Sequence, residues 1–173
     1  MAQEKIASKL KVLTIFLGVA GLAVFGLMGR NMYMAYFALS EDGSWNPALV
    51  PEEIHISASH LIPFLLLALT MVLCYMVLYR FYCVCGEIGR DNSFSRENVR
   101  NFARMKILLV VLSGMWTGYT IMFIILNGWN YLALVSRAAL LAVIFFVIAA
   151  LADALSKLIG RACEIREEND LTI

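Results

Sequence analysis

Four long stretches of apolar residues dominate the chain and are separated by short polar segments. A helix needs about 20 mostly apolar residues to cross a hydrocarbon core of about 30 Å, because each residue adds about 1.5 Å. The stretches that meet this requirement run from about 12 to 29, 56 to 78, 107 to 126 and 134 to 155. The pattern therefore predicts an all-α integral membrane protein in which residues 1–173 form a single domain of four transmembrane helices.

The helices are expected to be longer than the spans themselves. The first can continue to residue 39, and the second can continue through Arg80 to about residue 88. The third is predicted to begin at residue 95, because the Ser95 hydroxyl is suited to cap a helix and Glu97 is favourable in a first turn. About ten extra helical residues would carry the intervening turn roughly 15 Å beyond the span. Segment 89–106 is thus predicted to be a projecting helical hairpin.

Composition and charge agree with this architecture and orient it. The chain is 61% hydrophobic and 16% charged, with a mean hydropathy of +0.78, which is far from the composition of soluble proteins. Lysine and arginine are retained on the cytoplasmic side of membrane proteins, and only Arg30 and Arg137 of the 14 such residues fall on the opposite side. Both termini and the hairpin are therefore predicted to be cytoplasmic. The other twelve are Lys5, Lys9, Lys11, Arg80, Arg90, Arg96, Arg100, Arg104, Lys106, Lys157, Arg161 and Arg166.

Arginines form a stripe on the helix that follows the predicted turn. Arg96, Arg100 and Arg104 repeat at intervals of four residues and so share one face, whereas the apolar residues nearby lie on another side. Two interpretations remain open: the stripe contacts anionic lipid headgroups, or it docks a cytoplasmic partner. Direct binding to nucleic acid is not expected, since the net charge is only +1 and three arginines without a recognition module are a poor footprint.

The segment after the fourth span, residues 156–173, is predicted to be an acidic cytoplasmic tail. Its simplest interpretation is a helix that leaves the membrane and frays, because termini are usually loose. Alternatively, its carboxylates approach the hairpin arginines, or its last residues dock into a partner. The acidic residues are Glu164, Glu167, Glu168 and Asp170.

Groups that could carry chemistry are few, and no cofactor is expected. Cys83, Cys85 and Cys163 could together hold a soft metal ion, but two cysteines two residues apart on a helix point about 200° apart. His55 and His60 could bind a cation or sense pH, yet their spacing does not place them on one helix face. Packing or interfacial positions are the simpler interpretation of all five, and metal binding stays open.

The third span carries the hydroxyls of Ser113, Thr117 and Thr120 on one face beside Gly114 and Gly118. Such a face can line a solute pathway, or it can join helices by hydrogen bonds and close packing. Intramembrane charges usually mark transport paths, and none lies near the middle of a span. No catalytic set of nucleophile, base and acid is present in the sequence, so an enzyme is not expected.

A charge near the inner end of the fourth span has a simple explanation. Asp153 is followed one helical turn later by Lys157, and residues four apart on a helix lie side by side. The two are expected to form an ion pair.

Two short segments, DNSFSRENVR and REENDLTI, resemble a bacterial family of four-helix membrane proteins classified as a domain of unknown function. The resemblance covers nearly the whole chain. It implies a partnership with a small Cro/C1-type helix-turn-helix regulator, because members of the family are often encoded beside one. It supplies no catalytic residues. The residues that carry the match are Asn92, Phe94, Ser95, Glu97, Asn98, Glu168, Asp170 and Leu171.

The sequence thus predicts a multi-pass protein of the bacterial cytoplasmic membrane that acts in regulation or signalling by binding a small cytoplasmic helix-turn-helix transcription regulator. A small transporter or channel subunit is the alternative, and assembly into a homo-oligomer is left open. Besides the regulator, the lipid bilayer is the expected partner. The residues predicted to bind the regulator are Asn92, Phe94, Arg96, Arg100, Arg104, Glu168, Asp170 and Leu171.

Overall fold

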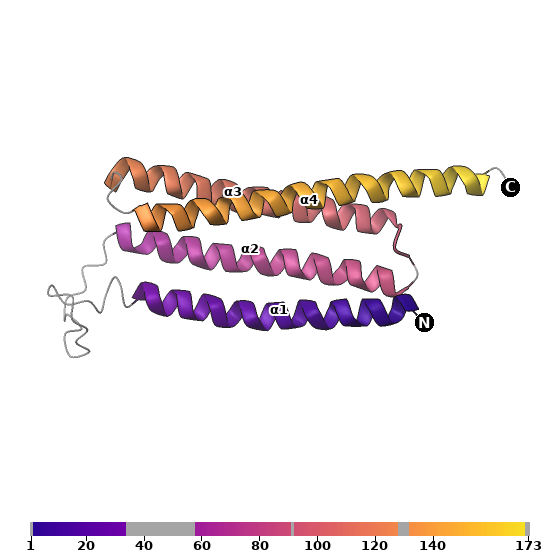
Figure 1. Cartoon of the computed structure of the whole chain (residues 1–173), viewed down its shortest axis with the longest axis horizontal. Helices are drawn as coiled ribbons and strands as arrows, with labels where there is room; N and C mark the ends of the chain where they lie inside the picture. Colours follow the sequence, from indigo (N-terminus) through magenta and orange to yellow (C-terminus); the bar gives the residue numbers. More distant parts are fainter. Residues whose placement is uncertain (1, 34–57, 91, 128–131, 172–173) are drawn as a thin grey trace. The chain divides into compact units, whose positions relative to one another are not determined.

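The computed structural model describes residues 2–33, 58–90, 92–127 and 132–171, and these residues form four long helices (Figure 1). No strand occurs among them. The fold class predicted from the apolar pattern is therefore confirmed as all-helical. The helices are α1 (Ala2–Tyr33), α2 (Ala58–Gly89), α3 (Arg96–Asn127) and α4 (Leu132–Leu171).

The ends of the second and third helices agree closely with the prediction. Helix α2 ends at Gly89 and α3 begins at Arg96, each one residue from its expected limit. The Ser95 hydroxyl accepts a hydrogen bond from the backbone N–H of Asn98 at 3.2 Å, which confirms Ser95 as the N-cap of α3. The expected continuation of α1 to residue 39 lies outside the described residues, which reach Tyr33.

All four helices are long and apolar enough to cross a membrane. Helices α1, α2 and α3 contain 32 residues each and α4 contains 40, so they are about 48 Å and about 60 Å long at about 1.5 Å per residue. A hydrocarbon core of about 30 Å is shorter than any of them. The helices must therefore tilt or extend into the headgroup region and beyond, whereas the side that the α2–α3 connection faces stays a prediction.

The C-terminal segment is a direct continuation of the fourth span. Helix α4 continues without a break from the fourth span to Leu171, which agrees with the expected helix, whereas the fraying of its end stays a prediction. This part of α4 is held by packing, because Cys163 is only 4% exposed and a Cβ atom at Gly160 would lie 4.0 Å from a methyl group of Val99 on α3. Chain ends are usually loose unless they are tied down, and these contacts offset part of the conformational entropy that this end loses when it is ordered.

The chain divides into two compact units, Met1–Ile15 with Leu73–Ile173 and Phe16–Val72. The second unit contains the later part of α1 and the first half of α2, where the Thr70 hydroxyl donates to the carbonyl of Leu66 at 2.7 Å. The first unit contains the hydrophobic core, to which α2, α3 and α4 all contribute. Its buried members are Val84, Phe102, Met105, Leu109, Leu112, Ala149 and Ala152.

Within the first unit, α3 and α4 run side by side in opposite directions (Figure 1). Four polar contacts between them follow one another along this interface, and we call this set the polar ladder. As the residue numbers of these contacts fall along α3, the numbers of their partners rise along α4, which is the pattern of an antiparallel pair. The contacts are Ser113 Oγ to the Ala142 carbonyl (2.9 Å), Lys106 Nζ to Asp153 (2.8 Å), Ser156 Oγ to the Val99 carbonyl (3.0 Å) and Arg96 to Glu167 (2.8 Å).

Only part of the hydroxyl face of α3 is used for helix packing, because Thr117, Gly114 and Gly118 are exposed. The Ser113 hydroxyl belongs to the polar ladder, whereas the hydroxyls of Thr117 and Thr120 donate to the carbonyls of Ser113 and Trp116, each at 2.8 Å. A hydroxyl that donates to the carbonyl one turn earlier needs no other donor-acceptor partner in an apolar environment. The three hydroxyls are thus satisfied within the described helices, and the solute pathway stays a prediction.

We expect Leu112→Ala to lower the stability of the protein in detergent. Leu112 is 0% exposed, and its truncation would leave a cavity in the core. In soluble proteins such a change costs about 2–5 kcal/mol, but we expect roughly 1–3 kcal/mol here, because lipid or detergent lowers the transfer part of that cost. Thermal unfolding followed by size-exclusion chromatography measures the effect, with Leu126→Ala as the matched control, since Leu126 is 71% exposed. Equal effects of the two changes would contradict the described core.

Candidate docking surface at the polar end of helices α2, α3 and α4

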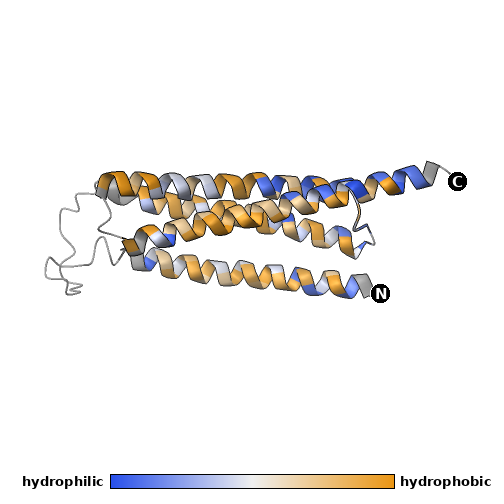
Figure 2. Cartoon of the chain, turned by 45° about the horizontal axis from the view of Figure 1, so that its top comes forward, coloured by the Kyte–Doolittle hydropathy of each residue, from blue (hydrophilic) through white to orange (hydrophobic). Residues whose placement is uncertain are grey.

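One end of the first unit collects most of its hydrophilic residues. We call it the polar end and define it as the last turn of α2, the connection 90–95, residues 96–106 of α3 and residues 153–171 of α4. Figure 2 shows hydrophilic residues gathered along the C-terminal part of α4, whereas the preceding part is hydrophobic. The antiparallel pairing of α3 and α4 places the arginines of the predicted hairpin and the acidic C-terminal segment at this same end.

The described part of the α2–α3 connection is fixed by local hydrogen bonds. The carbonyl of Glu87 accepts from the backbone N–H groups of Arg90 and Asn92, both at 3.1 Å, which satisfies part of the C-terminus of α2. The Glu87 carboxylate accepts from the Asn92 amide at 2.9 Å. At the other end of the connection, the Asn98 amide donates to the carbonyl of Ser93 at 2.9 Å. Asn92, predicted to bind a partner, thus uses its side chain within the chain.

Arg96 and Glu167 connect the start of α3 with the end of α4. The Arg96 guanidinium donates from Nε at 3.1 Å and from Nη2 at 2.8 Å to the two carboxylate oxygens of Glu167. This is the paired geometry in which the planar guanidinium matches a carboxylate best. The alternative interpretation, in which carboxylates of the C-terminal segment approach the hairpin arginines, is therefore confirmed for this pair.

The Arg96–Glu167 pair is exposed to solvent, and its attraction depends on the ionised carboxylate. Its side chains are 56% and 58% exposed. The hydrogen bonds from Arg96 hold the pKa of the Glu167 carboxyl below its usual value. A carboxyl with a lowered pKa in the folded state keeps its attraction at neutral pH and loses it only as the pH falls through that lowered pKa. The contact is thus expected at neutral pH and is lost only in acid.

The other two arginines of the stripe remain at the surface. Arg100 and Arg104 are exposed, and no ion pair joins either of them to another residue of the described segments. Phe94, in the connection that precedes α3, is 56% exposed. Two cationic side chains and an exposed aromatic ring therefore remain available for contacts outside the chain.

The C-terminal residues that were predicted to bind a partner are only partly described. Glu168 is exposed on α4. Asp170 and Leu171 belong to the last turn of α4, but their side chains lie outside the described residues. The sequence-based list also omits Glu167, although Glu167 is the acidic residue that contacts the arginine stripe.

Asp153 has two cationic partners. It accepts from Lys157 at 2.7 Å and from Lys106 at 2.8 Å. The contact with Lys157 confirms the ion pair expected from the spacing of four residues. The contact with Lys106 joins α3 to α4 and depends on the register of the two helices, so no local pattern in the sequence could reveal it.

Two buried asparagines on α3 also escaped prediction. Asn98 is 1% exposed and Asn101 is 3% exposed. The Asn98 Oδ1 and Asn101 Nδ2 atoms are buried without a hydrogen-bond partner in the described structure. Buried polar atoms usually have partners, so these two are unusual. The only sequence signal was the presence of two amides three residues apart on a helix that also carries a packed face.

The described residues contain no group of three or more histidine, cysteine or acidic side chains that could hold a metal ion. All four cysteines are free thiols, with Cys85 and Cys163 buried and Cys83 half-buried. The side chains of His55 and His60 lie outside the described residues. The metal interpretation of the outer histidines therefore stays a prediction that the described structure does not address.

We expect Glu167→Ala to loosen the end of α4 and to expose Cys163 to alkylation. Exposed ion pairs contribute little, so the rate of maleimide labelling of the Cys163 peptide, measured by mass spectrometry, should rise by at most about fivefold. Arg96→Ala should have the same effect, and the double variant should add nothing further, because both changes remove one contact. Arg166→Ala changes an exposed residue of the same segment and serves as the control. Unchanged labelling in both single variants would show that the pair does not hold α4 in place.

Comparisons with known proteins are consistent with the membrane architecture. Residues 2–173 match the family described as "Protein of unknown function (DUF2975)". The chain is also similar to the "Uncharacterized membrane protein YoaS" of Bacillus subtilis (strain 168), with 25% identity over 161 residues that cover 92% of this chain and 97% of that protein. No solved structure gives a significant match. Because the family match covers almost the entire chain, the protein belongs to the DUF2975 family of membrane proteins of unknown function.

Proposed function

We propose that this protein is a membrane-embedded regulatory component that binds a small cytoplasmic helix-turn-helix transcription regulator at the polar end. The observation that carries the proposal is that the three arginines of the stripe differ in their partners. Arg96 is bound to Glu167, whereas Arg100 and Arg104 are exposed without an ion pair to any described residue. Arginine and aromatic side chains dominate the binding energy of many interfaces, and Phe94 adds an exposed aromatic ring nearby in the sequence.

The contacts inside the polar end favour binding because they keep this surface in one arrangement. The Glu87 contacts hold the start of the connection, the Ser95 cap begins α3, and the Arg96–Glu167 pair joins α3 to α4. A surface that is already ordered loses less conformational entropy when a partner binds. The partner would therefore contact Arg100 and Arg104 on an ordered helix and not on a flexible loop.

The proposed side of the membrane follows from the distribution of cationic residues. Twelve of the 14 lysines and arginines lie at the N-terminus, around the α2–α3 connection or after the fourth span. Positive residues of short loops stay on the cytoplasmic side. We therefore place both termini and the polar end in the cytoplasm of a bacterial cell, with the chain in the inner membrane.

The chemistry of the surface defines the face of the regulator that would bind. Arg100 and Arg104 would pair with carboxylates, so the regulator would present an acidic patch and keep its basic DNA-contacting face free. The resemblance to a family encoded beside Cro/C1-type regulators supports this class of partner. An external signal that changed helix packing would need only about 1.4 kcal/mol of differential binding to change the affinity tenfold.

We expect Arg100→Glu combined with Arg104→Glu to abolish capture of the regulator by the full-length protein in detergent. Replacing two attractive charges with repulsive ones should weaken binding by at least about tenfold, as measured by co-purification and by biolayer interferometry. The control carries Lys5→Glu and Lys9→Glu, because these two exposed lysines lie on α1, outside the polar end, and give the same change in net charge. Binding that is equally reduced by both double variants would indicate general charge attraction, and unchanged binding in the first would remove α3 as the docking face.

The orientation has its own test. Single cysteines at Ser93→Cys and Asn169→Cys, in a background without the four native cysteines, should both react with a membrane-impermeant maleimide only after the cytoplasmic side is opened. Protection in intact spheroplasts and labelling in inverted vesicles is the expected pattern for both positions. Labelling of the two positions from opposite sides would contradict the shared polar end.

A further inference from the structure

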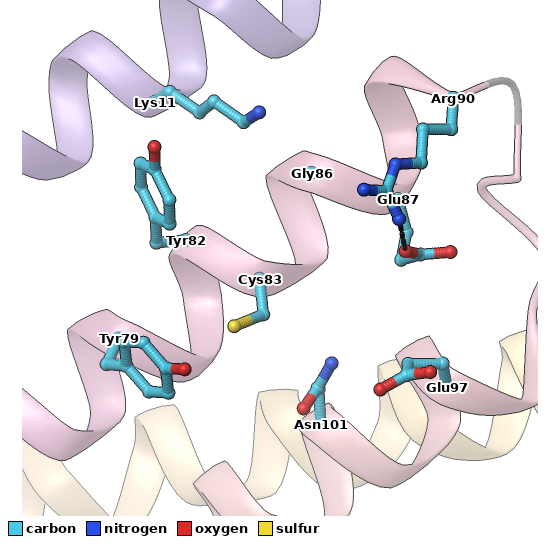
Figure 3. A pocket seen from close by; sticks show the side chains of 9 residues that line it. All are labelled: Lys11, Tyr79, Tyr82, Cys83, Gly86, Glu87, Arg90, Glu97 and Asn101. Atoms are coloured by element: carbon cyan, nitrogen blue, oxygen red, sulfur yellow. Dashed lines mark hydrogen bonds and ion pairs between the residues drawn. The ribbon is translucent and has the colours of Figure 1, made fainter.

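A cavity of about 410 Å³ lies at the polar end of the first unit, lined by the early part of α1, the last turns of α2 and the first turns of α3 (Figure 3). Sites for small molecules commonly have volumes of this order and a few well-placed polar groups. This cavity does not include Arg100 or Arg104, the residues of the proposed docking surface. Its contents are therefore a separate question from the binding of a regulator.

Asn101 places a buried hydrogen-bond donor beside this cavity. Its side chain extends from α3 into the cavity in Figure 3. The residue is 3% exposed, and its Nδ2 atom has no acceptor in the described structure. Leaving a buried donor unpaired is costly, so a group that brings an oxygen acceptor to this atom would bind favourably.

Lys11 supplies a cation from the other side of the cavity. Its Nζ atom lies 5.5 Å from the centroid of the Tyr82 ring, and a cation over an aromatic face is held by the charge distribution of the ring. No carboxylate of the described segments forms an ion pair with Lys11. The ammonium is thus positioned but lacks an anion.

The two carboxylates of the cavity differ in their partners. Glu87 is occupied by Arg90 and by the Asn92 amide. Glu97 lines the same cavity from α3 and forms no ion pair with any described residue. The cavity therefore combines a cation without an anion, a carboxylate without a cation, and a buried amide without an acceptor.

We propose that this cavity binds a zwitterion that combines a phosphate group with a primary ammonium, as in phosphoethanolamine. The phosphate oxygens would accept from Lys11 Nζ and Asn101 Nδ2, and the ammonium would donate to the Glu97 carboxylate. Both pairings are charge-assisted hydrogen bonds, which are stronger than neutral ones. An anion alone would leave Glu97 unpaired beside added negative charge, and a cation alone would do the same for Lys11.

The position of the cavity favours a lipid headgroup as the source of this group. Lys11 directly precedes the apolar stretch that begins at residue 12, so it lies at the edge of a predicted span. Tyr79, which also lines the cavity, is 62% exposed, and tyrosines with one polar end are typical of the boundary between hydrocarbon and water. A phosphatidylethanolamine headgroup occupies this depth, and a water-soluble phosphoethanolamine offers the same chemistry.

The test uses the full-length protein in detergent and native mass spectrometry, with added phosphatidylethanolamine, phosphatidylglycerol or phosphatidylcholine of the same acyl chains. We expect phosphatidylethanolamine to bind about tenfold more tightly than the other two, because only its headgroup has a primary ammonium that can donate to Glu97. In a parallel arm, free phosphoethanolamine is added and the thermal shift is recorded. A saturable shift with no preference among the lipids would assign the site to a soluble zwitterion instead.

Three variants separate the roles of the lining groups. Lys11→Gln should weaken phosphatidylethanolamine binding by roughly tenfold, and Glu97→Gln should remove the preference over phosphatidylglycerol. Asn101→Leu should reduce lipid binding without lowering the unfolding temperature, because its Nδ2 atom has no partner to lose. The matched controls are Lys9→Gln and Glu164→Gln, which remove exposed charges outside the cavity.

Two results would overturn the proposal. One is the absence of any preference for phosphatidylethanolamine together with no response to free phosphoethanolamine. The other is equal binding by the cavity variants and their matched controls. Either result leaves the proposed docking of a regulator intact, because that function is tested through Arg100 and Arg104.

Discussion

The register of α3 against α4 is the constraint on which the polar end depends. Helices in lipid gain little from apolar contact alone, because lipid tails are as apolar as leucine. Polar contacts with defined partners must therefore fix how far one helix has slid along the other. The polar ladder does this from Ser113 to Arg96, with one hydroxyl, one lysine–aspartate pair, a second hydroxyl and one arginine–glutamate pair. A shift of one turn would break all four contacts together.

The ladder also determines which arginines can serve another purpose. Because Glu167 is brought opposite Arg96, the first arginine of the stripe is used for structure, while Arg100 and Arg104 stay exposed. Asp153 similarly binds both Lys106 and Lys157. The charges of the polar end thus fall into two groups, one that holds the helices together and one that faces outward. This division is the physical basis of the proposed docking surface, and it follows from packing rather than from composition.

The cavity next to the α2–α3 connection is lined by polar groups that lack partners within the described chain. Its carboxylate Glu97 and its amide on Asn101 come from α3, and its ammonium on Lys11 comes from α1. None of them completes its interactions within the described chain in the way that the ladder residues do. Of the three, only Asn101 is buried, and buried polar groups are normally satisfied. Its unpaired amide therefore distinguishes this cavity, beside two charged groups without ion pairs to the described residues.

The sequence by itself determined the class of the protein, the helix limits around the connection and the Ser95 cap, because these depend on local composition, length and hydrogen bonds between near neighbours. It also fixed the Asp153–Lys157 pair through helical spacing. The tertiary structure alone decided that Glu167 meets Arg96, that Lys106 meets Asp153 and that Asn101 is buried beside a cavity. These contacts depend on which face and which turn of one helix packs against another. Arg96 and Glu167 are 71 positions apart, so no local sequence pattern indicates that they are in contact.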